Sequence, residues 1–267
     1  MGNDISRARV LTSTSFLVNF AVQLYGMAAT PNMKEVADAN HFAFSPNPWF
    51  IAAFFTGQVV LQLAWIRKLF TSEPPASYPT LGYQTIRAGV DTEEARSWAV
   101  ALSYAPVYAL GNLCIAGWLY FWLRQDFAAS QVLVTVNTLA QLVAVAALPP
   151  LRPDSDALLR LTHAAAKTFA GIGVLDFIDN GGVALRAHAP PTGFLQALTC
   201  VLFPLLAAGS SPMFGSVLLY DVVAITVGQT GVRGAGAWPV RLAWTAGATA
   251  VIVGLKSVRT VSRYLSR

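Results

Sequence analysis

Long runs of apolar residues, free or nearly free of charge, follow one another along the 267-residue chain. A run of about 20 residues in an α-helix crosses a hydrocarbon core of about 30 Å. A helix also satisfies every backbone polar group internally, as the bilayer interior requires. The pattern therefore predicts an all-α fold, a polytopic transmembrane helix bundle. The eight predicted spans are residues 10–29, 48–66, 98–123, 128–148, 157–178, 192–208, 213–229 and 237–258.

The span at residues 157–178 is the least regular of the eight, because it carries Arg160, His163, Lys167 and Asp176. If it lay outside the membrane, the bundle would have seven spans. With eight spans, one side of the membrane receives twelve Lys and Arg residues and the other side receives five. Because cytoplasmic loops carry the excess of basic residues, this arrangement places both termini in the cytoplasm, and we prefer it.

The composition is that of a membrane protein, with 55% hydrophobic and only 12% charged residues, against about 25% charged in soluble domains. The net charge of +5 comes from Lys and Arg between the apolar runs. We therefore interpret the basic residues as topology determinants and expect no nucleic-acid partner. No repeat divides the chain, so residues 1–267 are predicted to form a single transmembrane domain, with residues 67–97 as a polar cytoplasmic loop.

The first apolar run resembles a signal peptide in having basic residues before it. It also contains Asn19, Gln23 and Tyr25, polar side chains that suit a helix packed in a bundle. We therefore interpret this run as a membrane anchor. Residues 2–6 in addition fit the pattern for N-myristoylation, a glycine followed by three residues and a serine.

Asp221 is the most informative ionisable residue, because it lies in the middle of the otherwise uncharged run 213–229. Counted from the cytoplasmic end of their spans, Lys167 and Asp221 lie roughly 15 and 12 Å deep. We therefore expect them to pair near the midplane, with His163 one turn nearer the cytoplasm. Such a pair would be a site for a proton or a substrate, or it would be a structural ion pair. In a third alternative, Asp221 is neutral and forms a hydrogen bond to a neighbouring helix.

Asp176 and Asp179 are three residues apart and so share one helix face. This spacing can hold a divalent metal with a diphosphate, as in membrane prenyltransferases, which use two acidic clusters with more carboxylates in each. The chain has a single pair, which a helix end at the membrane surface explains more simply. We therefore expect no metal and no cofactor.

Polar side chains recur within the predicted spans, and we expect most of them to bridge helices. Tyr104, Tyr108 and Asn112 share the third span with Pro106, which can kink a helix, so these three side chains are candidates for lining a ligand cavity. The amides concerned are Asn19, Gln23, Gln58, Gln62, Asn112, Asn137, Gln141 and Gln196. In the last span, Arg241 and Lys256 are expected to extend toward opposite membrane surfaces.

The segment that leads into the second span reads His41, Phe42, Ala43, Phe44, Ser45, Pro46, Asn47, Pro48, Trp49, Phe50. It resembles the Pro- and aromatic-rich entry in larger relatives of the translocator protein (tryptophan-rich sensory protein) family, and it is also similar to fungal multi-pass membrane proteins of unknown function. The resemblance covers residues 41–68. Core members of that family have five helices and bind tetrapyrroles or sterols within the bundle, so the resemblance implies a small hydrophobic ligand.

These features together predict a non-enzymatic protein of the lipid bilayer that binds or transports a small, hydrophobic molecule. Lys167, Asp221 and His163 are candidate ligand-binding residues, together with the polar group in the third span. An alternative is a membrane-embedded enzyme of the cyclase or prenyl-handling type, in which Asp221 or the pair Asp176 and Asp179 supplies the acid. A further alternative is a structural membrane subunit, whose polar residues would face partner helices.

Overall fold

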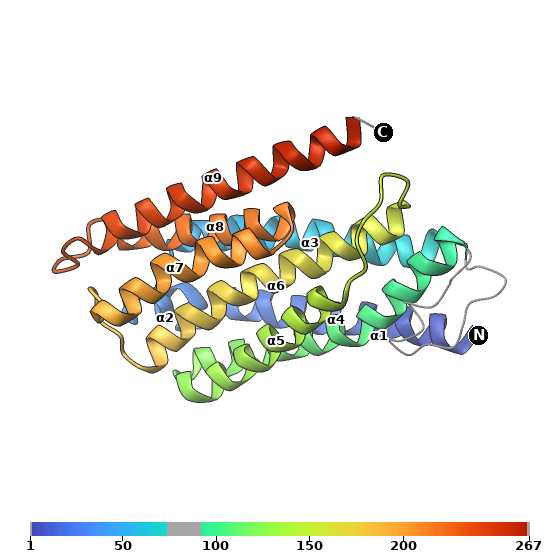
Figure 1. Ribbon diagram of the computed structural model, residues 1–267. Helices are drawn as coiled ribbons and strands as arrows, with labels where there is room; N and C mark the ends of the chain where they lie inside the picture. Colours follow the sequence, from blue (N-terminus) through green and yellow to red (C-terminus); the bar gives the residue numbers. More distant parts are fainter. Residues whose placement is uncertain (1, 74–91, 266–267) are drawn as a thin grey trace.

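The computed structural model describes residues 2–73 and 92–265. These residues form an all-α bundle with no strand among them (Figure 1). Nine helices are present in this part of the chain. They are α1 (Gly2–Ala28), α2 (Met33–Ala39), α3 (Pro48–Thr71), α4 (Glu93–Leu123), α5 (Phe127–Ala147), α6 (Ala157–Ala184), α7 (Gly193–Gly209), α8 (Pro212–Gln229) and α9 (Trp238–Leu265).

Eight of these helices are long and lie roughly side by side, with their direction alternating along the chain (Figure 1). The short helix α2 is the exception. Its capping box has Asn32 accepting from the backbone of Glu35 while the Glu35 side chain accepts from the Asn32 amide. The start of α1 and the end of α9 lie at the same end of the bundle, which we call the terminal end, whereas α2 lies toward the opposite end, the α2 end (Figure 1).

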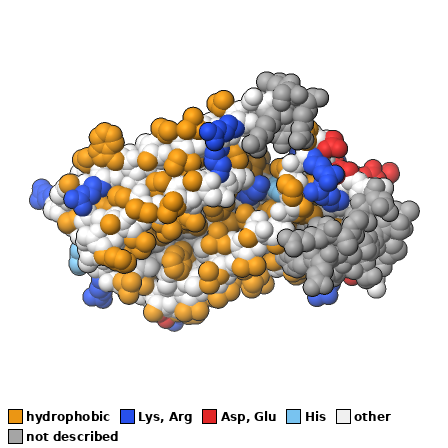
Figure 2. All heavy atoms as spheres, viewed as in Figure 1, with side chains coloured by type: hydrophobic (Ala, Val, Ile, Leu, Met, Phe, Trp, Pro, Cys, Tyr) orange, Lys and Arg blue, Asp and Glu red, His pale blue; other side chains and the backbone are white. Residues whose placement is uncertain are grey.

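The outer faces of the long helices are apolar. Val10 on α1, Val143 on α5 and Trp244 on α9 are 63%, 68% and 77% exposed. Hydrophobic side chains cover much of the flank of the bundle in view, while most charged side chains lie toward its ends (Figure 2). Six helices, α1, α3, α4, α5, α8 and α9, are long and apolar enough to cross a membrane. These are the features of a multi-pass membrane protein.

Each of the eight predicted spans overlaps one long helix, but several helices extend beyond the apolar run. α1 begins at Gly2 instead of residue 10, α6 continues to Ala184 and α9 to Leu265. α4 begins at Glu93 because the Thr92 side chain accepts from the Ala95 amide, 3.2 Å away. The predicted loop 67–97 is therefore helical at both ends, and residues 74–91 within it lie outside the described residues.

α6 is the central helix, in contact with α3, α4, α5 and α8. Small residues allow this close packing: Ala165, Ala166 and Ala170 are fully buried. At Gly171 the backbone of α6 approaches α8 so closely that an added Cβ would collide with the side chain of Val217. This contact fixes the register between α6 and α8, which run in the same direction.

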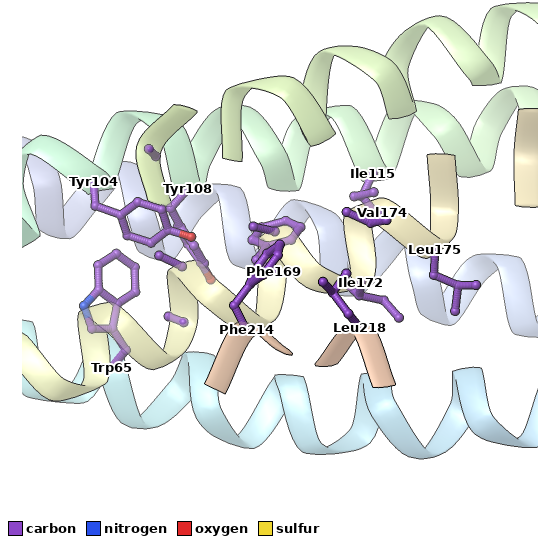
Figure 3. Packing of buried hydrophobic residues seen from close by; sticks show 14 of the residues in the cluster. Trp65, Tyr104, Tyr108, Ile115, Phe169, Ile172, Val174, Leu175, Phe214 and Leu218 are labelled. Atoms are coloured by element: carbon purple, nitrogen blue, oxygen red, sulfur yellow. The ribbon is translucent and has the colours of Figure 1, made fainter. Parts of the chain in front are cut away.

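Aromatic side chains fill the core between α6 and its neighbours. Trp65 of α3 lies against Tyr104 and Tyr108 of α4, and Phe169 of α6 lies beside Phe214 of α8 (Figure 3). The indole Nε1 of Trp65 also donates to Thr162 Oγ1 of α6 at 2.9 Å. The core in this region is thus packed by large rings whose polar atoms find partners within the bundle.

The turn between α7 and α8 lies well short of the terminal end that α6 and α9 approach (Figure 1). α7 and α8 have only 17 and 18 residues, compared with 28 in both α6 and α9. At this turn Lys256 of α9 donates to the carbonyl oxygens of Ala207, Ala208 and Ser210. Its ammonium thus caps the end of α7, where the last carbonyls lack partners within the helix. That Lys256 extends to a membrane surface stays a prediction.

Candidate functional site

The segment of residues 41–47 is bound across the α2 end of the bundle by hydrogen bonds from several helices. The Gln229 side chain at the end of α8 donates to the carbonyls of Phe42 at 2.7 Å and Ser45 at 3.1 Å. The Trp238 indole of α9 donates to the Ala43 carbonyl at 2.7 Å. Ala43, Phe44 and Ser45 are buried as a result, with at most 7% of each exposed.

After this segment the chain enters α3, whose first residues lie beside α8. The amide of Asn47 donates to the Ala224 carbonyl at 2.9 Å, and the Tyr220 hydroxyl donates to the carbonyl of Phe50 at 2.7 Å. The backbone of Gly228 lies so close to the segment that an added Cβ would be 2.6 Å from the carbonyl carbon of Pro46. Segment 41–47 and the start of α3 therefore cover the part of α8 that carries Asp221.

Ser45 joins this segment to α6. Its hydroxyl donates to Asp179 Oδ1 at 2.9 Å and accepts from the amide of Phe42 at 3.1 Å. Asp179 is half-buried, and so is Asp176 one turn earlier on α6. One carboxylate of the predicted pair thus has a protein partner, supplied by a segment that is more than a hundred residues away in sequence.

Asp221 is the most isolated polar group at this site. It is 0% exposed, and neither of its carboxylate oxygens has a hydrogen-bond partner among the described residues. Asp176 of α6 lies within electrostatic range of it. Burying a charged carboxylate without a partner costs several kcal/mol. Either protonation of Asp221 or a bound partner that donates a hydrogen bond to it would remove this cost.

The predicted pair of Lys167 and Asp221 is not formed, since the described residues contain no ion pair between them. The expectation assumed that α6 and α8 begin at the same membrane surface. α8 begins deeper, at the short α7–α8 turn, and Val217 packs against Gly171. The two helices run in the same direction, and Asp221 is four residues beyond Val217. It is therefore level with residues 175–176 of α6 and not with Lys167.

Lys167 and His163 belong to a different environment, nearer the terminal end. His163 is 1% exposed, and the carbonyl of Pro149 is the backbone group near its ring. Lys167 and Arg96 are the charged groups within electrostatic range of it. The structure therefore separates the candidate residues into an acidic site with Asp221, Asp176 and Asp179 and a basic region with His163 and Lys167.

Tyr104, Tyr108 and Asn112 are all fully buried and bonded to protein groups. Tyr104 donates to Gln141 Oε1 at 3.0 Å, and Tyr108 donates to Gln62 Oε1 at 2.6 Å. The void beside Tyr104 measures about 10 Å³, roughly the minimum for one water molecule. These side chains join α4 to α5 and α3, and this arrangement leaves no room for a ligand beside Tyr104.

Five of the eight amides predicted to bridge helices do so. Asn19 of α1 donates to Asn112 Oδ1 of α4 at 2.9 Å. Gln62 and Gln141 accept from the tyrosines of α4, and Gln196 of α7 accepts from Arg241 of α9. Gln23 bonds instead to Asn19 on its own helix. Asn137 has no partner for either side-chain atom, and Gln58 none for its Nε2, among the residues described.

Among the described residues, no group of three or more His, Cys, Asp or Glu side chains could hold a metal ion. The acidic site is thus two carboxylates on α6 and one on α8, with Ser45 as an added polar group. Ser45, Gln229 and Trp238 were not predicted as site residues. The sequence signal for Ser45 is the proline- and aromatic-rich composition of residues 41–50, which does not show where the segment binds. Gln229 and Trp238 lie outside that segment and have no such signal.

No protein-family model, no curated protein and no solved structure matches the chain.

Proposed function

We propose that the chain is a multi-pass membrane protein that crosses the bilayer eight times and binds a small hydrophobic molecule at the carboxylate of Asp221. The observation that carries the proposal is that both Asp221 oxygens are buried without a hydrogen-bond partner among the described residues. A ligand that donates a hydrogen bond or carries a positive charge would remove the cost of this burial. We therefore expect a largely apolar molecule with at least one donor group.

Two observations favour eight crossings. α6, which carries charged residues, is packed among α3, α4, α5 and α8 and runs alongside them (Figure 1). Its 28 residues extend about 42 Å, enough for a hydrocarbon core of about 30 Å. α7 and α8 are shorter, but Lys256 binds the carbonyls at their turn, as a turn within a membrane requires.

Segment 41–47 is the proposed cover of the site. It contacts α8 at Ala224, Gly228 and Gln229, on the C-terminal side of Asp221, while Phe50 at the start of α3 contacts Tyr220 on the other side. Ser45 of the segment also holds Asp179. Movement of this segment would open the carboxylates without separating the central helices. The resemblance of residues 41–68 to the translocator protein family implies the same class of ligand, a small hydrophobic molecule.

Mass spectrometry of organic extracts from purified protein tests the ligand. We expect a small molecule to co-purify with the wild-type chain and to be depleted in Asp221→Asn, which keeps the shape of the side chain and removes its charge. Asp38→Asn is the matched control, because it alters an exposed carboxylate on α2. Identical extracts from wild type and Asp221→Asn, with both proteins folded, would contradict the proposal.

Cysteine labelling tests the number of crossings. In a background without Cys114 and Cys200, Asp154→Cys places a thiol before α6 and His188→Cys places one after it; both positions are exposed. If α6 crosses the membrane, an impermeant maleimide reacts with the two thiols from opposite sides. Labelling of both from the same side would show that α6 does not span.

A further inference from the structure

A second candidate site lies at the terminal end, where the α5–α6 loop meets the start of α6. A surface pocket of about 340 Å³ is lined there by Leu151, Arg152, Pro153 and Arg160. The guanidinium of Arg160 is fixed at its wall, because Nη2 donates to the carbonyl of Pro153 at 2.6 Å. Two guanidinium groups thus border one pocket, and one of them is held in place by the backbone.

Acidic side chains do not neutralise these arginines. Asp156 accepts from the Leu159 amide at 2.8 Å as the N-cap of α6. Within residues 2–73 and 92–265, neither Arg152 nor Arg160 forms an ion pair. The Asp156 carboxylate occupies the N-terminus of α6, and Asp154 is exposed in the same loop. The attraction for an anion in the pocket therefore comes from the two guanidinium groups, which bind phosphate in many proteins.

The basic face continues along α6 into the bundle. Arg160 and Lys167 are seven residues apart, which places them within about 20° around the helix. Lys167 is half-buried and has no ion pair or side-chain hydrogen bond to a described residue. Lys167 does not line the pocket itself, but it adds a third cation to the same face of α6, about 10 Å further along the helix than Arg160.

We propose that Arg152, Arg160 and Lys167 form a binding site for a phosphate-bearing anion, supplied by an anionic phospholipid headgroup or by a free phosphate. Planar guanidinium groups bind phosphate oxygens in bidentate fashion, and basic pockets between membrane helices bind anionic headgroups. The site is separate from Asp221 at the other end of α6, and it does not depend on any ligand there.

The test uses the full chain in nanodiscs of phosphatidylcholine alone or mixed with phosphatidylglycerol, with native mass spectrometry of retained lipid as the readout. Arg152→Gln combined with Arg160→Gln removes both guanidinium groups. The matched control is Arg186→Gln combined with Arg233→Gln, which removes two exposed arginines from the α2 end. We expect the first pair to weaken phosphatidylglycerol retention by roughly thirtyfold, from the contribution of two basic residues, and the control pair to leave it unchanged.

Inorganic phosphate, compared with chloride at equal ionic strength, distinguishes the two sources. If it raises the thermal unfolding midpoint of the wild type in phosphatidylcholine nanodiscs and not that of the glutamine pair, a free phosphate is sufficient. If only phosphatidylglycerol has this effect, the anion is a lipid headgroup. Should the pair fail to fold, Arg152→Gln alone takes its place, since no hydrogen bond of that side chain is broken. Equal lipid retention and equal phosphate response in the Arg152 and Arg160 variants and in the control would overturn the proposal.

Discussion

The ammonium of Lys256 on α9 donates to the main-chain carbonyl of Ala207 near the end of α7, with an N–O distance of 3.0 Å. It also donates to the carbonyls of Ala208 and Ser210. The last carbonyls of a helix lack partners within it, and a cation at that end interacts favourably with the helix dipole. One side chain thus closes the α7–α8 turn, about 14 Å before α9 ends at Leu265.

Lys256→Met is therefore expected to lower the stability of the folded bundle. The substitution keeps an apolar chain of similar length but removes the charged donor from three partly buried or exposed carbonyls at the end of α7, at a cost of about 1–3 kcal/mol. The measurement is the thermal unfolding midpoint in one detergent, with Arg259→Met as a control that removes an exposed cation one turn further along α9. Equal midpoints for the two variants would show that the capping contact contributes nothing to stability.

Gly228→Ala is expected to displace segment 41–47 from α8. The new methyl group would lie 2.6 Å from the carbonyl carbon of Pro46 and 2.7 Å from the amide nitrogen of Asn47, both backbone atoms that cannot rotate away. Overpacking of this kind costs about 1–3 kcal/mol. Faster proteolysis or hydrogen exchange within residues 41–47 would report the displacement.

Gly247→Ala is the matched control for that experiment. Nothing lies within 4 Å of a Cβ added at Gly247 of α9, so the same substitution should leave stability unchanged or raise it by up to about 1 kcal/mol through the better helix propensity of alanine. A loss of stability in both variants would mean that glycine itself, and not the contact with segment 41–47, is required.

The sequence was sufficient for the helices but not for their relative depth. Apolar runs such as residues 128–148 and 213–229 correspond closely to α5 and α8 because helix formation in an apolar run is local. The level of Asp221 depends on how far α8 is shifted along α6, and the packing of Val217 against Gly171 shows this shift. The position of Ser45 against Asp179 depends on contacts across 134 residues, which no local pattern records.

The hydrogen bond between Asn19 and Asn112 should couple α1 to α4. Asn19 Nδ2 donates to Asn112 Oδ1 at 2.9 Å, and Asn112 Nδ2 donates to the Tyr108 carbonyl at 3.0 Å. Replacing either asparagine by leucine leaves a polar group of the other without its partner. In a double-mutant cycle of unfolding free energies we expect a coupling of about 0.6 kcal/mol, up to about 1.7 kcal/mol. Additive effects would show that the bond does not stabilise the pair of helices.

The register of α6 and α8 makes a final prediction about the acidic site. Because Val217 packs against Gly171, Asp221 lies near Asp176 and far from Lys167. Asp221→Asn and Lys167→Met should therefore change the unfolding free energy independently, with effects that add within about 0.3–0.5 kcal/mol. Asp221→Asn and Asp176→Asn should be coupled, because a charge on either carboxyl disfavours the charged form of the other.

The two cycles distinguish the arrangements because Asp221→Asn is common to both. Coupling with Asp176→Asn alone places Asp221 at the acidic site with Asp179 and Ser45, where a bound ligand would relieve repulsion between carboxylates. Coupling with Lys167→Met alone would instead restore an ion pair between α6 and α8. That result would require α8 to be displaced by two to three turns along α6, and the contact between Gly171 and Val217 would then have to be broken.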